Sequence, residues 1–164
     1  MNYAAATVTN CYATGAVTGR SAVGGIAGNV NRGSVSNCYA IGNITATYTT
    51  GGVAGGISDE GKLEKSFALN PVVKGGGEYV GRVVGSNHGD LLGGNYALAT
   101  MSDGGGTAFI NEGGVTVTGT THVNGANVTD ANAKLPATYT AQGWNFTTVW
   151  QIQSGVNNGY PTLR

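Results

Sequence analysis

The chain has 164 residues, and its eight acidic and eight basic side chains give it a formal net charge of zero at pH 7. This balance excludes the basic surface with which proteins bind nucleic acids or anionic membranes, so we expect neither partner. Only 10% of the residues are charged, whereas about 25% is usual. Glycine accounts for 30 of the 164 residues, whereas about 7% is usual. Both departures favour a fold with many tight corners.

Two short phrases recur along the first part of the chain. One has the form Asn-Cys-Tyr-Ala, and its aromatic residue stands at Tyr12, Tyr39, Phe67 and Tyr96. The other is rich in glycine and occupies residues 24–28, 51–55 and 81–85. Both phrases return about every 27 to 30 residues. A period of this length is typical of a solenoid, in which each repeat buries its apolar face only by stacking on its neighbours.

The residue types within each repeat predict strands. Gly, Val, Ile, Thr, Tyr and Asn dominate, while good helix formers are scarce, which excludes a helical repeat. Small or apolar residues alternate with period 2, as at Cys38, Ala40 and Ile44. We therefore predict an all-β fold, a right-handed parallel β-helix of about three to four coils over residues 1–102, followed by a C-terminal capping region over 103–164.

The repeats predict an incomplete first coil over residues 1–22 and full coils over 23–49 and 50–79. Because the glycine-rich phrase of the first coil is missing, we expect an open strand edge near Tyr3–Tyr12 and end-to-end self-association there. We also expect the chain to be the C-terminal piece of a longer protein. No apolar run approaches the roughly 18 residues of a membrane span, and no leader is apparent, so we expect no membrane insertion in this stretch.

Two positions in the repeats leave alternatives open. Cys11 and Cys38 occupy equivalent places on adjacent coils, so they are either two stacked thiols or a disulfide; Ser66 and Asn95 take that place later and favour the thiols. Arg82 replaces the second glycine of its phrase. We expect its guanidinium to pair with a carboxylate such as Glu78 or Asp90, or to bind carbonyl groups at the end of the stack, more than to bind a ligand.

The stretch formed by residues 24–28 and 35–44 resembles the GLUG repeat, and residues 68–97 are similar to a variant of it from surface proteins of gut Bacteroidetes. The resemblance covers about residues 5–101. The repeat is found in bacterial surface proteins, in large adhesins and in bacterial immunoglobulin A peptidases outside their catalytic part. It implies an extracellular or cell-surface location and a role in adhesion, with a host or bacterial surface protein or a glycan as the partner, and it carries no catalytic residue.

The region after residue 102 departs from the repeat. Residues 115–118 and 121–128 alternate as strands, and a short helix is expected from Ala131 to Leu135, ending at Pro136. The last twenty-one residues are the most aromatic, with Trp144, Trp150 and Tyr160 among them. We expect these side chains to cover the open end of the solenoid; the alternative is a platform that binds sugars.

The sequence offers little for catalysis, and we expect no enzyme, no catalytic residue, no metal site and no cofactor. The glycine-rich turn at residues 102–107 lacks the regular spacing of calcium-binding β-rolls. Some parallel β-helices cleave polysaccharides with stacked acids and bases, and the nearest candidates here are Arg82, His88 and Asp90.

The recurring aromatic residues suggest one candidate surface. If Cys38 and Ala40 point into the coil, the period of 2 directs Tyr39 outward, and the four aromatic rings form a stripe along one outer face. This stripe either binds a sugar or a protein, or stacks between coils, or lies under the capping region. The sequence therefore predicts a non-enzymatic extracellular spacer or adhesion module, with a carbohydrate-binding or carbohydrate-active domain as the alternative.

Overall fold

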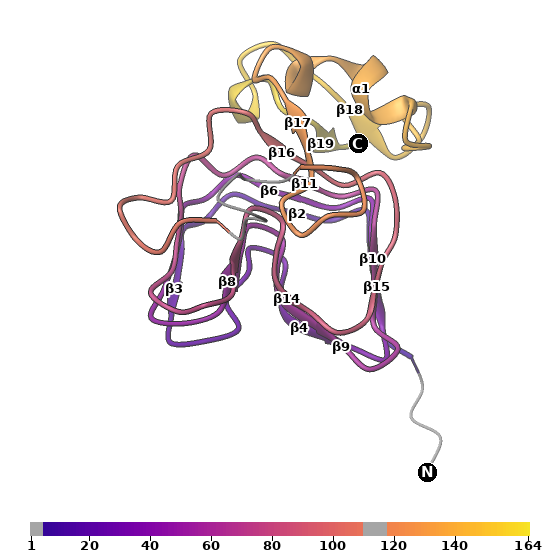
Figure 1. Ribbon diagram of the computed structural model, residues 1–164. Coiled ribbons are helices and arrows are strands. Elements are labelled where there is room, and N and C mark those ends of the chain that lie inside the picture. Colours follow the sequence, from indigo (N-terminus) through magenta and orange to yellow (C-terminus); the bar gives the residue numbers. More distant parts are fainter. Residues whose placement is uncertain (1–4, 110–117) are drawn as a thin grey trace.

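The structure is a computed structural model that describes residues 5–109 and 118–164. The chain winds into a parallel β-solenoid of about four turns, which confirms the predicted all-β fold class. Figure 1 looks nearly along the stack, so that successive coils overlap and the C-terminal segment lies beside them at the top.

Short strands stack into five columns around the solenoid, and every strand pairs in parallel with its counterpart one coil away. The β1 sheet contains β1 (Thr7–Thr9), β5 (Ser34–Ser36), β10 (Lys62–Glu64) and β15 (Asp90–Leu91). The aromatic sheet contains β2 (Tyr12–Ala13), β6 (Tyr39–Ala40), β11 (Phe67–Ala68), β16 (Tyr96–Leu98) and β17 (Ala126–Val128). The remaining columns are β3 (Val17–Gly19), β7 (Ile44–Ala46) and β12 (Val73–Lys74); β8 (Thr50–Gly51) and β13 (Val80–Gly81); and β4 (Ala27–Asn31), β9 (Ala54–Ser58) and β14 (Val84–Asn87).

The register of the aromatic sheet places the four repeated aromatic residues in line. Tyr12 pairs with Tyr39, and Phe67 pairs with both Tyr39 and Tyr96. The predicted equivalence of these positions is therefore confirmed.

Glycine and alanine let each coil fold inward, so that β8 and β14 run between two lobes in Figure 1. A Cβ atom added to Gly25 would meet the Cβ of Ala40, and one added to Gly52 would lie 2.7 Å from the Cβ of Ala68. The glycine-rich phrase thus lies directly against the alanine of the Asn-Cys-Tyr-Ala phrase. Larger side chains at either position would force the two walls of the coil apart.

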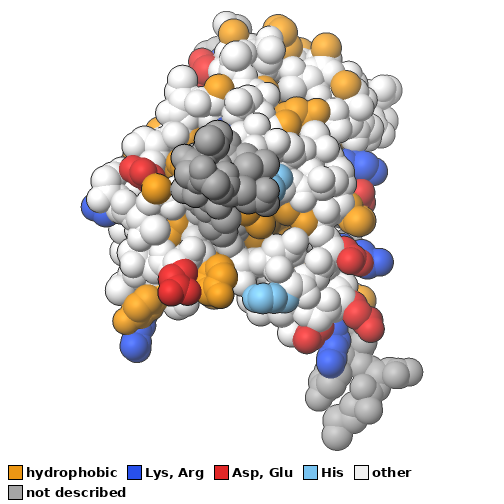
Figure 2. Space-filling view, in the orientation of Figure 1, with side chains coloured by type: hydrophobic (Ala, Val, Ile, Leu, Met, Phe, Trp, Pro, Cys, Tyr) orange, Lys and Arg blue, Asp and Glu red, His pale blue; other side chains and the backbone are white. Residues whose placement is uncertain are grey.

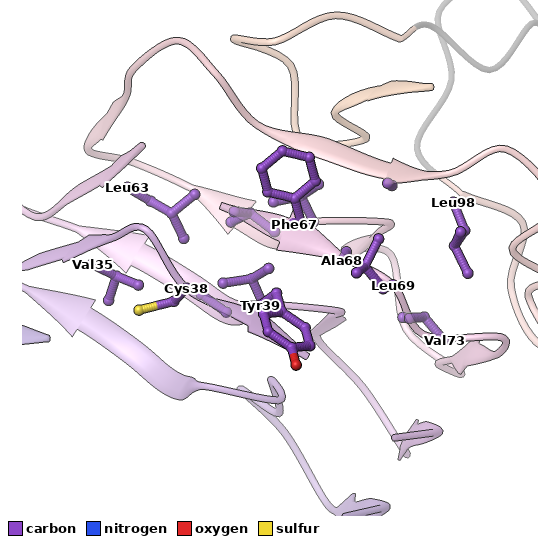
Figure 3. Close-up of a cluster of buried hydrophobic side chains, with 14 of the residues drawn as sticks. Val35, Cys38, Tyr39, Leu63, Phe67, Ala68, Leu69, Val73 and Leu98 are labelled. Carbon is purple, nitrogen blue, oxygen red and sulfur yellow. The ribbon is translucent and has the colours of Figure 1, made fainter. Parts of the chain in front are cut away.

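Aliphatic side chains fill the two lobes between these walls. Figure 3 shows part of this core, in which Val35, Leu63 and Val73 point into the interior from two successive coils. All three are at most 2% exposed. Because each coil supplies the same kind of side chain at the same place, the core runs continuously through the stack.

The last coil is closed by a shortcut rather than by a full turn. The backbone amides of Val83 and Val84 donate hydrogen bonds to the carbonyl of Val123, at 2.9 and 3.0 Å, and the chain then enters β17 on top of β16. Of the predicted strand at residues 121–128, only Ala126–Val128 is extended. Most of the one predicted at residues 115–118 lies outside the described residues.

The C-terminal segment combines short helices with one hairpin. It contains the 3-10 helix η1 (Asn132–Lys134), α1 (Pro136–Thr140), η2 (Asn157–Gly159) and the antiparallel pair β18 (Trp150–Gln151) and β19 (Thr162–Leu163). The short helix predicted from Ala131 to Leu135 is present as η1, which ends before Pro136. The second helix, α1, was not predicted; it begins at Pro136, where the fixed φ and missing amide proton of proline suit the first turn. Within the described residues, no helix has the length and apolar character needed to cross a membrane.

Candidate functional site

The aromatic column consists of Tyr12, Tyr39, Phe67 and Tyr96, on the outer face of the aromatic sheet. It divides into two stacked pairs. The ring centroids of Tyr12 and Tyr39 are 5.3 Å apart with an angle of 5° between the planes, and those of Phe67 and Tyr96 are 5.0 Å apart with an angle of 13°. The parallel register of the strands produces this stacking directly, since equivalent side chains on adjacent coils lie one above the other.

The C-terminal segment covers this column with further rings. Trp144 contacts a ring of each stacked pair, with centroid distances of 6.4 Å to Tyr39 and 5.6 Å to Phe67. The ring centroid of Trp150 lies 4.7 Å from that of Trp144 and 6.1 Å from that of Tyr39. The result is an aromatic cluster shared between the solenoid and the segment, which buries large rings from both.

Hydrogen bonds at the edges of the cluster fix the segment to the solenoid. The indole NH of Trp144 donates to the carbonyl of Lys65 at 3.0 Å, and that of Trp150 donates to Oδ1 of Asn10 at 3.2 Å. The hydroxyl of Tyr39 donates to the carbonyl of Pro161. These bonds satisfy polar atoms that burial would otherwise leave without partners.

The cluster buries most of the residues proposed for binding. Tyr39, Phe67 and Trp150 are fully buried, Trp144 is 2% exposed and Tyr160 is 8% exposed, whereas Tyr12 and Tyr96 are half-buried. The buried rings form neither a continuous exposed stripe nor an open sugar platform. The alternation of the strands correctly directs the column outward, but it carries no information about the segment that covers it.

The location expected for the C-terminal aromatic residues is also different in the structure. They lie along the side of the solenoid, on the outer face of the aromatic sheet, and not over the end of the stack (Figure 1). Residues 118–128 cross the end instead. The aromatic column attracts the C-terminal rings because it is the large apolar surface that the repeat leaves on its outside.

Tyr139 is a member of the cluster that the sequence did not reveal. Its ring centroid is 4.7 Å from that of Phe67, and its hydroxyl donates to the carbonyl of Ala133 at 2.6 Å. It belongs to no repeat of the sequence, so only its position in the short helix α1 could have indicated that it joins the cluster. Burial raises the pKa of Tyr39, Tyr139 and Tyr160 above the ordinary value for tyrosine.

The two cysteines are free thiols, so the expectation of stacked thiols holds and no disulfide joins the first two coils. Cys38 is buried and its Sγ donates to the carbonyl of Ser36 at 3.0 Å. Burial raises the pKa of Cys38 to about 12. The thiol is therefore protonated and unreactive at neutral pH.

The structure separates the three residues considered for polysaccharide cleavage. His88 lies on the exposed turn between β14 and β15 and Asp90 is the exposed first residue of β15, whereas Arg82 is 5% exposed and follows β13 inside the coil. Within residues 5–109 and 118–164, no cluster of three or more metal-ligating side chains occurs. Charges on the face shown in Figure 2 are sparse and of both signs.

Arg82 binds neutral oxygen atoms at the end of the stack. Its Nη2 donates to the carbonyls of Ala97 and Leu98, at 2.8 and 2.7 Å, and its Nη1 donates to Oδ1 of Asn127 at 2.7 Å. Of the two contacts considered from the sequence, the one with carbonyl groups is formed. No ion pair between Arg82 and a carboxylate occurs among the described residues.

A depression of about 470 Å³ opens where the C-terminal segment meets the solenoid. Its walls are formed by Ile41, Leu69, Pro71, Lys134, Asn158 and Tyr160. The ammonium of Lys134 lies 5.1 Å from the ring centroid of Tyr160 and 2.7 Å from Oδ2 of Asp130. The hydrogen bonds from Lys134 and from the hydroxyl of Tyr160 lower the pKa of Asp130. The depression thus combines an apolar floor with a charged and hydrogen-bonding rim.

Comparison with known proteins gives one family. The model of the GLUG motif matches residues 19–45, whereas searches of curated proteins and of solved structures found no match. Gly19 pairs with Ala46 in the β3 and β7 column, so the matched stretch corresponds to one full turn of the solenoid. It contains both the glycine-rich phrase and the aromatic phrase, and the neighbouring coils repeat this pattern. The chain therefore contains a GLUG motif at residues 19–45, and this motif builds one coil of the parallel β-solenoid.

Proposed function

We propose that the chain is a non-enzymatic module of a secreted or cell-surface protein, and that its solenoid is a rigid spacer presenting a surface for adhesion. The observation that carries this proposal is the aromatic cluster. Its largest rings are used to fix the C-terminal segment along four coils, so they stiffen the stack and are not available to a ligand. The resemblance to repeats of bacterial surface proteins supports the location.

Side chains on the outside of the solenoid extend the regular stacking. Ser34 donates a hydrogen bond to Thr7 and Ser36 donates to Thr9, one coil away, at 3.3 and 3.2 Å. Asn31 donates to Oδ2 of Asp59 at 2.7 Å in the same manner. Such ladders hold exposed polar groups at a spacing of about 4.8 Å. A rigid, regularly spaced surface of this kind suits the recognition of a repetitive protein partner.

A second candidate function is carbohydrate binding, and the depression of about 470 Å³ favours it. It offers an apolar floor, the amide of Asn158 and the paired charges of Lys134 and Asp130. Sugars are commonly bound by such a mixture of apolar surface and a few polar groups.

A glycan array and an assay for released reducing sugars distinguish these functions. The spacer predicts no binding on the array and no released sugar. Binding without release identifies a carbohydrate-binding module, and it should then be lost in Lys134→Ala but retained in Lys74→Ala, which changes an exposed lysine away from the depression. Release of product would overturn the proposal that the chain is not an enzyme.

A further inference from the structure

Arg82 occupies a place where the earlier coils have glycine. Its backbone keeps the repeat, since its carbonyl accepts a hydrogen bond from Gly52 at 3.0 Å and its amide donates to Oδ1 of Asn124 at 3.2 Å. The side chain fits because the shortcut through Val123 replaces a further coil at this end. The arginine thus lies inside the wall of the last coil and reaches the end of the stack.

The positive charge of Arg82 has no anionic partner among the described residues. The three hydrogen bonds of its guanidinium go to two backbone carbonyls and one side-chain amide. Its Nε atom is buried and, in the part of the chain that the structure describes, has no hydrogen-bond partner. A buried cation held only by neutral oxygen atoms is costly, and a bound anion relieves much of this cost.

A depression of about 290 Å³ opens beside this guanidinium. It is lined by Arg82, Ala99, Met101, Phe109, Thr118 and Asn127. Met101 and Phe109 are buried and supply an apolar wall, whereas Ala99, Thr118 and Asn127 are exposed and form the mouth. The volume is at the lower limit for small-molecule sites, which corresponds to a ligand of about the size of one sugar or one amino acid.

We propose that this depression binds a small carboxylate, with the anionic group at Arg82 and the body of the ligand against Met101 and Phe109. Guanidinium groups prefer carboxylates because charge-assisted hydrogen bonds between them are short and strong. Two sources share this chemistry, the uronic acid of a glycan and the terminal carboxylate of a peptide. The site does not depend on the spacer function, and it is separate from the depression at the C-terminal segment.

Isothermal titration calorimetry with four probes tests the site. Methyl glucuronide and N-acetylalanine carry the carboxylate, and methyl glucoside and N-acetylalaninamide are their uncharged counterparts. We expect at least one acid to bind and to raise the melting temperature, and its neutral counterpart to bind at least about tenfold more weakly. The acid that binds identifies the source. If neither acid binds at millimolar concentrations, or if acid and neutral counterpart bind equally, the proposal is wrong.

Variants locate the binding. Arg82→Gln should abolish it, whereas Arg32→Gln, which changes an arginine whose side chain is 55% exposed, should leave it unchanged. Because Arg82→Gln also removes hydrogen bonds of the fold, Ala99→Leu provides a second variant, which fills the mouth of the depression and leaves the contacts of Arg82 intact. Loss of binding in Ala99→Leu, with an unchanged circular dichroism spectrum, supports the site; full retention contradicts it.

Discussion

Glycine at repeated positions decides whether each coil can close. Where the glycine-rich phrase faces the aromatic sheet it leaves no space for a side chain, because the alanine of the other phrase occupies that space. The two phrases keep one register in the sequence for this reason: they contact one another across the interior of the coil, as Gly25 contacts Ala40 and Gly52 contacts Ala68.

Gly52→Ala should therefore destabilise the fold. The added Cβ would lie 2.5 Å from the carbonyl oxygen of Arg82 and 2.7 Å from the Cβ of Ala68, and overpacking of this kind costs about 1 to 3 kcal/mol. The matched control is Gly93→Ala, where no atom lies within 4 Å of the added Cβ. Urea unfolding measures both. Equal unfolding free energies for the two variants would show that the close approach is absent.

Arg82 shows how far single residues were predictable. Its departure from the glycine pattern marks it as unusual in the sequence, and carbonyl groups at the end of the stack were one of its two expected partners. Which carbonyls it binds was not predictable, because Ala97 and Leu98 approach it only through the stacking of coils. Asn127 and Thr118 were equally hidden, since they lie beyond the repeats.

At the scale of elements, the C-terminal segment is fixed by rings that the repeat presents outward. Periodicity predicted the strands and the column well, because parallel stacking places equivalent residues together. It left burial under the capping region as one alternative for the column, but it did not predict that the C-terminal segment lies along the side of the solenoid. That part follows from contacts between residues distant in sequence, such as Trp150 with Asn10 and Tyr39 with Pro161, for which no repeat gives a signal.

Removal of Trp144 should loosen this segment from the solenoid. Trp144→Ala deletes the ring that contacts both stacked pairs, together with its hydrogen bond to Lys65. We expect the free energy of unfolding to fall by about 3 to 5 kcal/mol. Tyr48→Ala, at a ring that is 48% exposed, is the control and should cost much less. Thermal unfolding followed by near-ultraviolet circular dichroism compares them. An equal loss in both variants contradicts the cluster as described.

The buried tyrosines also make stability depend on alkaline pH. Burial raises the pKa of Tyr39, Tyr139 and Tyr160 above the unfolded value of about 10. The folded state therefore keeps these protons longer, so the stabilisation is complete below about pH 10 and is lost as the pH rises further. Cys38, whose pKa is raised to about 12, also makes the folded state less stable once the pH rises above the ordinary pKa of a thiol.

Urea unfolding at about pH 8 and about pH 11 measures this effect. The unfolding free energy should fall between the two, and the fall should be smaller in Tyr139→Phe, which has one fewer group to ionise. A free energy that is the same at both pH values, or that rises, is incompatible with burial of these hydroxyl groups.

At the scale of the whole molecule, the two ends of the solenoid differ. Residues 118–128 and Arg82 cover one end. At the other, the outer edges of β1, β2, β3 and β4 have no strand partner within the described residues, and Val8, Val17 and Ile26 are only partly buried there. When this 164-residue stretch is prepared by itself, we expect its copies to associate through the open edges, head to head, because the covered end offers no edge for head-to-tail stacking.

Sedimentation velocity at increasing concentration should show a reversible dimer and no longer species. Val8→Lys, at the open edge, should reduce the association, whereas Leu92→Lys, at an exposed leucine on a later coil, should not. A monomer at the highest concentration, or filaments that lengthen with concentration, would contradict this expectation.

The central claim is that successive coils lie in parallel register, and cysteine crosslinking measures it directly. With Cys11 and Cys38 replaced by serine and alanine, Ser34→Cys and Lys62→Cys should form a disulfide on mild oxidation, since these residues pair across adjacent strands at a distance of about 5 Å. Ser34→Cys with Glu64→Cys is displaced by two residues, about 8 Å apart, and should stay reduced. Efficient bonding in the second pair and none in the first would contradict the solenoid register.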